Sequence, residues 1–189
     1  MSSPASTTAA GSTVDDSGVE VYAPVDGPVL RGLLYPRRRR WTASQLRELT
    51  TRATDLLRDE LTGAARYVPD QRWWARLALT DGVELWLLTW LPGQHTEPHD
   101  HGGASGSFTV LSGELGESYR LPPDRVREAD RTAGETVAFG PYYAHQVHNR
   151  SAAPAASVHA YSPPLLDTRT YASLADVPTP AGRDSGVQR

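Results

Sequence analysis

The sequence predicts a mainly β fold, a small antiparallel barrel or double-sheet jelly roll with a short N-terminal helical segment. The first observation is a series of short apolar or alternating segments from Arg66 onward. The second is that turn residues separate them, as at Asp81-Gly82, Ser112-Gly113 and Pro122-Pro123. The expected strands are 73–79, 83–91, 96–101, 107–111, 114–121, 135–139, 145–149 and 155–161. Many short strands at close spacing are typical of these architectures.

One amphipathic helix is expected over residues 42–61. Thr42 followed by Gln45 fits a capping box at its start, and Gly63 is a plausible stop. Before this helix, the segment 19–35 alternates apolar residues with Pro and Gly and is expected to hold a short strand. The apolar positions that recur at helical spacing are Leu46, Leu49, Ala53, Leu56, Leu57 and Leu61.

The chain of 189 residues is expected to form one domain over residues 19–176. Residues 1–18 are small and polar and are expected to be disordered, and residues 177–189 form a tail expected to be flexible.

Composition excludes several classes of function. A net charge of −3 gives no electrostatic case for a nucleic-acid partner, and the run from Arg37 to Arg40 is interpreted as a solvated face. The absence of cysteine excludes disulfides, thiolate ligands and cysteine nucleophiles. No apolar run suits a secretory signal or a membrane span, so we expect a cytoplasmic protein without membrane partners.

Two histidines separated by one residue, His99 and His101, are the strongest chemical signal. In an extended strand, side chains two residues apart share a face, so these imidazoles form half of a metal site. A bare pair of this kind can also be two polar residues of a surface loop. Turn residues before and after the pair favour the metal interpretation: Pro92 and Gly93, then Gly102 and Gly103.

The spacing Gly93, five residues, His99, one, His101, four, Gly106, six, Gly113 resembles the first motif of the cupin family. In that motif most cupins carry a ligating glutamate, and this chain has Gly106 there. A second block from Gly134 to Asn149 resembles the second cupin motif, and the resemblance supplies a third ligand, His145. His148 is expected on the opposite strand face, as a surface or packing residue, and His95 in an exposed turn.

Loss of the carboxylate changes the charge of the site. Three neutral histidines leave ferrous iron with both positive charges, which favours an anionic ligand such as a thiolate and leaves positions open. The nearest acids are Glu97 and Asp100, and Asp100 is expected to point away from the shared face.

Ser157, His159 and Tyr161 alternate in the last expected strand, so all three can face one cavity and form a row of hydrogen bonds. The alternative is a polar patch that satisfies itself in the barrel interior. A serine hydrolase is disfavoured, because no acid follows at a supporting position and no Gly-x-Ser-x-Gly elbow exists.

The histidine pair without glutamate, the third histidine, and the Ser-x-His-x-Tyr-Ser-Pro-Pro segment together resemble cysteine dioxygenase. The resemblance covers residues 42–168. It implies one Fe(II) per chain held by His99, His101 and His145, and a relay of Ser157, His159 and Tyr161 beside it. It also implies that the Tyr161 hydroxyl faces substrate and oxygen, and that the Ser162-Pro163 bond is cis.

The same resemblance implies that Arg76 binds the substrate carboxylate, since a guanidinium matches a carboxylate bidentately. Arg76 could also be a surface strand residue, and Arg66 and Arg72 are nearby competitors. Animal members cross-link a cysteine to the tyrosine, whereas this chain has Gly106 at the aligned position, so Tyr161 acts unmodified, as in the bacterial type. A related subgroup that acts on 3-mercaptopropionate carries glutamine where Arg76 stands.

The sequence therefore predicts an iron-dependent thiol dioxygenase that converts L-cysteine and O2 to cysteine sulfinic acid. Two alternatives stay open: a 3-mercaptopropionate dioxygenase, and a non-catalytic cupin that binds a metal or small molecule. The expected partners are the small thiol and O2, with no nucleic acid, and the expected assembly is a monomer.

Overall fold

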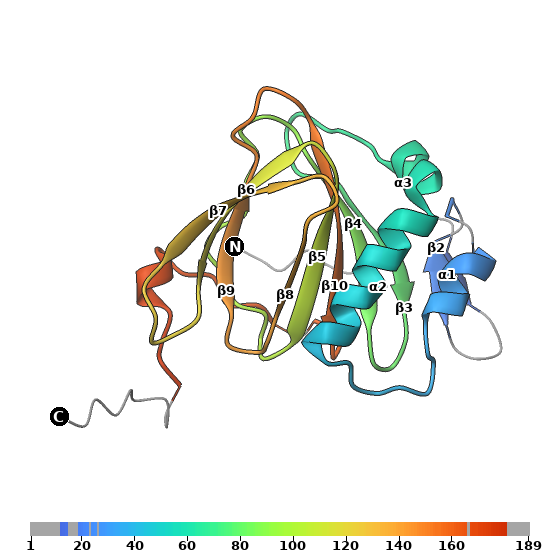
Figure 1. The fold of residues 1–189 in the computed structure, drawn as a ribbon, viewed down its shortest axis with the longest axis horizontal. Coiled ribbons are helices and arrows are strands. Elements are labelled where there is room, and N and C mark those ends of the chain that lie inside the picture. The colour runs from blue at the N-terminus through green and yellow to red at the C-terminus, as the bar shows by residue number, and fades with distance from the viewer. Residues whose placement is uncertain (1–11, 15–18, 23, 26, 166, 181–189) are drawn as a thin grey trace.

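Two antiparallel sheets face each other in the computed structural model, which describes residues 12–14, 19–22, 24–25, 27–165 and 167–180 (Figure 1). The larger sheet has the strand order β1-β2-β3-β4-β10-β5-β8, and the smaller has the order β7-β6-β9. The strands of the larger sheet are Ser12–Val14, Glu20–Tyr22, Trp74–Leu79, Glu84–Trp90, Ala155–Ser162, Ser105–Ser112 and Thr136–Phe139. Those of the smaller are Arg127–Thr132, Glu114–Arg120 and Ala144–His148. The predicted jelly-roll class is confirmed.

The central strand β10 separates two cores. It pairs with β4 on one side and β5 on the other, and all eight of its residues are buried. Its alternate residues Ala156, Val158 and Ala160 belong to a core cluster shared with the helices. Its other face looks between the two sheets, where Phe108 and Val147 lie in the second core cluster. Strand alternation therefore places the polar residues of β10 inside the barrel and its small apolar residues under a helix.

Helix α2, Ala43–Leu56, covers the outer face of the larger sheet (Figure 1). Thr42 is its N-cap, and the predicted capping box is present: the Thr42 hydroxyl accepts a hydrogen bond from the Gln45 amide, and the Gln45 side chain accepts one from the Thr42 amide. Leu46 and Leu49 are buried against the sheet, which gives this helix its place.

The expected single helix over 42–61 is instead two helices. Leu57 leaves helical geometry with φ −119° and ψ 23°, and α3, Arg58–Ala64, follows it. Leu56 is 54% exposed although its spacing predicted burial, because the break at Leu57 lets Leu57 and Leu61 take the buried positions. The helix also continues through Gly63, whose φ is not in the left-handed region that makes glycine a helix stop. A further short helix, α1, Gly27–Leu33, was not predicted.

Two strand predictions differ from the structure. Residues 96–101 form only isolated bridges at His99, with both His145 and Thr170, because Pro98 cannot donate a backbone hydrogen bond that would continue a ladder. Strand β7 was missed because its sequence, READRT, is polar, and its residues alternate between exposed and half-buried. It lies at the edge of the smaller sheet, where burial is not required.

The terminal segments differ from expectation where they are described. Ser12–Val14, expected to be disordered, forms strand β1 against β2, and the other residues of 1–18 lie outside the described ranges. Val177, at the start of the expected flexible tail, is buried with Leu174 beside Ala144, and residues 181–189 lie outside the described ranges. The short helix η1, Leu174–Asp176, precedes it.

The arginine run lies largely in solvent, as interpreted from the sequence. Arg37, Arg39 and Arg40 are exposed, and the Arg38 guanidinium lies 4.4 Å from the ring centre of Tyr35. None of the helices in the described ranges is both long and apolar enough to cross a lipid bilayer.

Candidate metal centre

Three histidines from two separate segments converge inside the barrel. His99 and His101 come from the loop between β4 and β5, and His145 comes from β9. The backbones of His99 and His145 exchange two hydrogen bonds, of 3.0 and 2.9 Å, which fixes the loop against the strand. One candidate ligand nitrogen from each ring lies within 4.8 Å of the other two. The predicted placement of His99 and His101 on one face is therefore confirmed, although the loop is not a regular strand.

Each of the three imidazoles is held through its Nδ1 atom. His99 Nδ1 lies 2.8 Å from the Glu97 carbonyl oxygen, and His101 Nδ1 lies 3.3 Å from the Tyr143 carbonyl oxygen. His145 Nδ1 lies 3.0 Å from a carboxylate oxygen of Glu117. All three partners are acceptors, so each Nδ1 carries the proton and each Nε2 presents a free lone pair.

The exposed lone pairs fit a metal ion. His101 Nε2 is buried and has no hydrogen-bond partner, although a buried polar atom is ordinarily paired. Neutral imidazole nitrogens suit zinc, copper, iron and nickel. An ion bound to the three Nε2 atoms would supply the missing partner, and the Nδ1 hydrogen bonds already provide the outer support that such ligands need.

The protein keeps the His99 and His101 rings neutral. Desolvation and the neighbouring His145 lower the pKa of His99 to about 3. Burial, then His145 and His99, lower the pKa of His101 well below its ordinary value. Because only the neutral ring can bind a metal, these two ligands are in their binding-competent protonation state at neutral pH.

No carboxylate of the described residues joins this group of ligands. At Gly106, where most cupins carry glutamate, an added Cβ atom would clash with the Phe139 ring. That ring stacks on His101, with centroids 4.6 Å apart. A larger residue at Gly106 would therefore displace the aromatic wall that positions His101.

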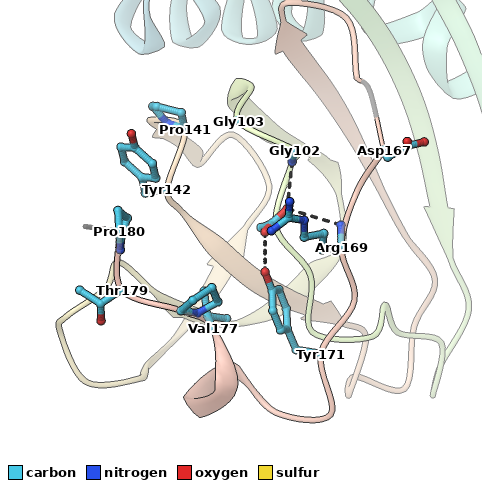
Figure 2. Close-up of a pocket in the computed structure, with 12 residues that line it drawn as sticks. Gly102, Gly103, Pro141, Tyr142, Asp167, Arg169, Tyr171, Val177, Thr179 and Pro180 are labelled. Carbon is cyan, nitrogen blue, oxygen red and sulfur yellow. Dashed lines mark hydrogen bonds between the residues drawn. The ribbon is translucent and has the colours of Figure 1, made fainter. Parts of the chain in front are cut away.

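Asp100 points away from the metal face, as expected, and holds the outer side of the loop. Its carboxylate accepts hydrogen bonds from the Tyr171 hydroxyl, at 2.6 Å, and from the backbone amides of Gly102 and Arg169, at 2.9 and 3.4 Å (Figure 2). Burial and this contact raise the pKa of Tyr171 to about 12, which keeps the donor protonated. A surface pocket of about 630 Å³ lies here, and none of the three candidate ligands lines it.

Glu117, which the sequence reasoning did not single out, is the acid closest to the ligands. Its Oε1 accepts from His145 Nδ1 and from the Tyr143 hydroxyl at 2.7 Å, and its Oε2 accepts from Arg131 at 2.9 and 3.0 Å. Burial alone would raise the pKa of Glu117, but the contacts with His145, Tyr143 and Arg131 outweigh it and hold the pKa below its ordinary value. A single glutamate in an alternating strand carries no sequence signal for such a role.

The predicted row of hydrogen bonds on β10 is present. Ser157 Oγ lies 2.8 Å from His159 Nε2, and His159 Nδ1 lies 3.1 Å from the Tyr161 hydroxyl. Trp90 Nε1 extends the row by donating to Ser157 Oγ at 2.9 Å. An indole nitrogen can only donate, so we assign the Ser157 proton to His159 Nε2 and the His159 Nδ1 proton to the Tyr161 oxygen. The Tyr161 hydroxyl proton is then free to point elsewhere.

Two further features keep Tyr161 a donor next to the ligands. Burial, then Glu84, raises its pKa above the ordinary value, so the phenol stays protonated. Burial, then His145 and Arg72, lowers the pKa of His159 well below its ordinary value, so the imidazole stays neutral.

The Tyr161 ring stacks on His101, with centroids 5.3 Å apart. The Ser162-Pro163 bond that follows is cis, as the resemblance implied.

The two upstream arginines differ in their partners. Arg76 faces the barrel, opposite Trp86, but its guanidinium is paired with the Glu20 carboxylate at 3.1 Å. Arg72 lies over the Trp90 ring at 5.0 Å, and its charge affects His99, His159 and Tyr161. Within the described ranges, no hydrogen bond or ion pair holds the Arg72 side chain. Among the described residues, Arg72 therefore lacks an acidic partner, whereas the predicted Arg76 has one in Glu20.

The remaining candidates lie outside the site. His148 is buried, its ring packs over Gly116, and it is not part of the ligand group, in agreement with the expected packing role. His95 is exposed and contacts the Gly93 carbonyl oxygen. Arg66 is exposed.

Comparison with known families supports this interpretation of the site. Residues 52–173 match the family model described as "Cysteine dioxygenase type I". The matched segment covers more than half of the chain and includes all three histidines, Tyr161 and Arg72.

Individual relatives are more distant. A germin-like protein 1-1 of Oryza sativa subsp. japonica is 30% identical over 94 residues, which is 50% of this chain and 44% of the rice protein. The solved TT1209 of Thermus thermophilus is 27% identical with a TM-score of 0.48, covering 55% of this chain and 94% of that one. An uncharacterized double-stranded β-helix protein of Klebsiella pneumoniae is 20% identical with a TM-score of 0.49, covering 58% and 92%.

Single replacement of His99, His101 or His145 by Ala should remove most of the iron that the protein binds after anaerobic Fe(II) reconstitution, because each supplies one of three Nε2 atoms. His148→Ala is the matched control and should retain iron, because that ring lies outside the group. Iron content per chain is measured after gel filtration. Retention of iron in His145→Ala together with its loss in His148→Ala would mean that the ligand set is wrong.

The metal-free protein should lose stability as the pH falls from about 6.5 toward 3. In the unfolded chain histidines take up protons near pH 6.5, whereas folded His99, His101 and His159 resist protonation, so the unfolded state binds more protons in this window. The free energy of unfolding therefore rises with pH there. Unfolding near pH 5 should be accompanied by the uptake of about three protons by these residues. The measurement is the slope of the free energy of unfolding against pH, obtained from urea titrations at several pH values around 5.

His159→Gln tests the assignment of that proton uptake. Glutamine retains a donor and an acceptor but does not titrate, so the variant should take up about one proton less on unfolding at pH 5. An unchanged pH slope would contradict the claim that buried His159 stays neutral.

Proposed function

Since the chain belongs to the cysteine dioxygenase type I family, we propose that it is an iron-dependent thiol dioxygenase that oxidises L-cysteine with O2 to cysteine sulfinic acid. The observation that carries the proposal is the group of three histidines, which no carboxylate of the described residues joins, beside a protonated Tyr161 and an Arg72 that has no acidic partner among those residues. In this reaction both oxygen atoms of O2 become bonded to the thiolate sulfur. The sulfur is oxidised by four electrons and O2 is reduced by four, so no further reductant is needed.

His99, His101 and His145 would hold the iron. When bound, ferrous iron supplies open coordination positions and the redox capacity that O2 chemistry requires. An imidazole that binds the ion through Nε2 and keeps its Nδ1 proton carries no charge, so the site would keep both positive charges of the ion and favour an anionic thiolate. Glu117 reaches the site only through the far nitrogen of His145, at 3.0 Å, and leaves this preference in place.

Tyr161 would orient the reactants through its hydroxyl proton. The row from Trp90 through Ser157 and His159 directs a donor at the Tyr161 oxygen, which leaves the phenol proton for the substrate sulfur or oxygen. Tyr161 keeps its proton and His159 is neutral, so His159 donates a hydrogen bond to the Tyr161 oxygen and no proton is transferred between the two side chains.

Arg72 would bind the substrate carboxylate. The half-buried Arg72 guanidinium has no acidic partner among the described residues and can bind a carboxylate bidentately, whereas the Arg76 guanidinium already contacts both oxygens of Glu20, at 3.1 and 3.3 Å. Using Arg76 would require breaking that pair. The assignment of this role therefore moves from Arg76 to Arg72.

A 3-mercaptopropionate dioxygenase is the second candidate, and the engagement of Arg76 with Glu20 favours keeping it. Arginine at position 76 favours cysteine over 3-mercaptopropionate only if its guanidinium can reach the substrate, and here that guanidinium is paired with Glu20. A carboxylate bound by Arg72 would serve either thiol. The proposal includes a cytoplasmic monomer whose partners are the thiol and O2.

The direct test is oxygen uptake by the protein after anaerobic Fe(II) loading, with cysteine, 3-mercaptopropionate and cysteamine as substrates. The proposal predicts one O2 consumed per cysteine sulfinic acid formed and the highest kcat/KM for cysteine. A higher kcat/KM for 3-mercaptopropionate would select the second candidate. Bound iron without oxygen uptake for any thiol would indicate a non-catalytic cupin.

Arg72→Gln should reduce kcat/KM for cysteine by more than tenfold, because truncating one partner of a buried charge pair costs on the order of 2–5 kcal/mol. Arg76→Gln is the matched control and should change kcat/KM much less, because its partner is Glu20. Cysteamine, which lacks the carboxylate, should respond weakly to both changes. Equal losses for cysteine and cysteamine in Arg72→Gln, or a larger loss in Arg76→Gln, would refute the assignment.

A further inference from the structure

Glu117 is a fully buried acid that the proposed reaction does not use. It lies on β6, opposite Val147 of β9 and Ala129 of β7, and its side chain has no exposed surface. Burying a carboxylate is costly unless it is paired and hydrogen-bonded. This one is held by His145 and Tyr143 through Oε1 and by Arg131 through Oε2.

The three candidate ligands differ in what supports them. His99 and His101 donate their Nδ1 protons to neutral backbone carbonyl oxygens, whereas His145 donates to the Glu117 carboxylate. A carboxylate behind a ligating histidine fixes the ring and raises its basicity more than a carbonyl does. The group of three is therefore electronically unequal, with His145 the strongest donor.

We propose that Glu117 is the positioning residue for the metal centre, and that it sets metal affinity through His145. This inference rests on the metal site of the proposed function. The Glu117 carboxylate would act on the metal only from behind His145, so it fills no coordination position. Arg131 contacts the other carboxylate oxygen, Oε2, at 2.9 and 3.0 Å.

Arg131 and Tyr143 compete with His145 for the same charge. Arg131 neutralises part of the carboxylate from the edge strand β7, and the Tyr143 hydroxyl donates to the very oxygen that accepts from His145. Removing either competitor should leave more negative charge for His145. Glu117 is thus expected to raise the metal affinity of the site, whereas Arg131 and Tyr143 are expected to lower it.

The test is the dissociation constant for Co(II), used as an air-stable probe and measured by competition with a chromophoric chelator. Glu117→Gln keeps an acceptor for His145 but removes the charge, and it should weaken Co(II) binding by about 10–100-fold. Glu114→Gln, an exposed change on the same strand, is the matched control and should have no effect.

Arg131→Met separates positioning from a structural role. It breaks the same ion pair as Glu117→Gln but keeps the contact with His145, so Co(II) affinity should stay equal or rise. Thermal unfolding of the metal-free variants reports separately on the fold. An unchanged affinity in Glu117→Gln, or an equal loss in both variants, would overturn the proposal.

Tyr143→Phe keeps the proposal testable if Glu117→Gln does not fold. Loss of the competing donor should tighten Co(II) binding, and unchanged or weaker binding would count against the proposal. Failure of this inference is distinguishable from failure of the proposed function. A protein that binds Co(II) through Glu117-supported His145 but oxidises no thiol would contradict only the function, and full activity with unchanged affinity in Glu117→Gln would contradict only the inference.

Discussion

The three hydrogen bonds to the Nδ1 atoms are the interaction on which the site depends. The Glu97 carbonyl, the Tyr143 carbonyl and the Glu117 carboxylate each accept a hydrogen bond from one Nδ1 atom. These hydrogen bonds fix the tautomer and the orientation of each ring, and therefore the direction of its Nε2 lone pair. Without these acceptors the rings could rotate or exchange tautomers, and the orphaned His101 Nε2 could find another partner. Metal-binding capacity therefore depends on two backbone carbonyls and one side-chain carboxylate around the ligands, and not only on the ligands.

The charges around the candidate metal centre favour the binding of an anion. His99 and His101 are neutral, and Arg72 adds a cation that has no acidic partner among the described residues. The two closest acids are turned outward or held behind a ligand: Asp100 by Tyr171 and Glu117 by Arg131. The same barrel face carries Tyr161 as a protonated donor. A thiolate with a carboxylate at a short distance matches this arrangement better than a neutral ligand does.

The sequence predicted the elements whose signal is local. Alternation in β10 placed the Ser157 row correctly, and the histidine spacing placed His99 beside His101. What could not be predicted depends on contacts between distant segments. Which arginine is proposed to bind the substrate carboxylate depends on Glu20, which lies more than fifty positions away in β2 and pairs with Arg76. The local sequence around Arg72 and Arg76 does not predict that pairing. The role of Glu117 depends in the same way on the register between β6 and β9, which only the folded chain reveals.

The most direct test of the account is an anaerobic crystal structure of the Fe(II)-loaded protein with anomalous scattering measured at the iron edge. The account predicts a single strong peak bonded to the Nε2 atoms of His99, His101 and His145, with no carboxylate oxygen from the protein in contact with the ion. A peak bonded to an Nδ1 atom, a Glu117 or Asp100 oxygen among the ligands, or a peak at another place in the molecule would contradict it.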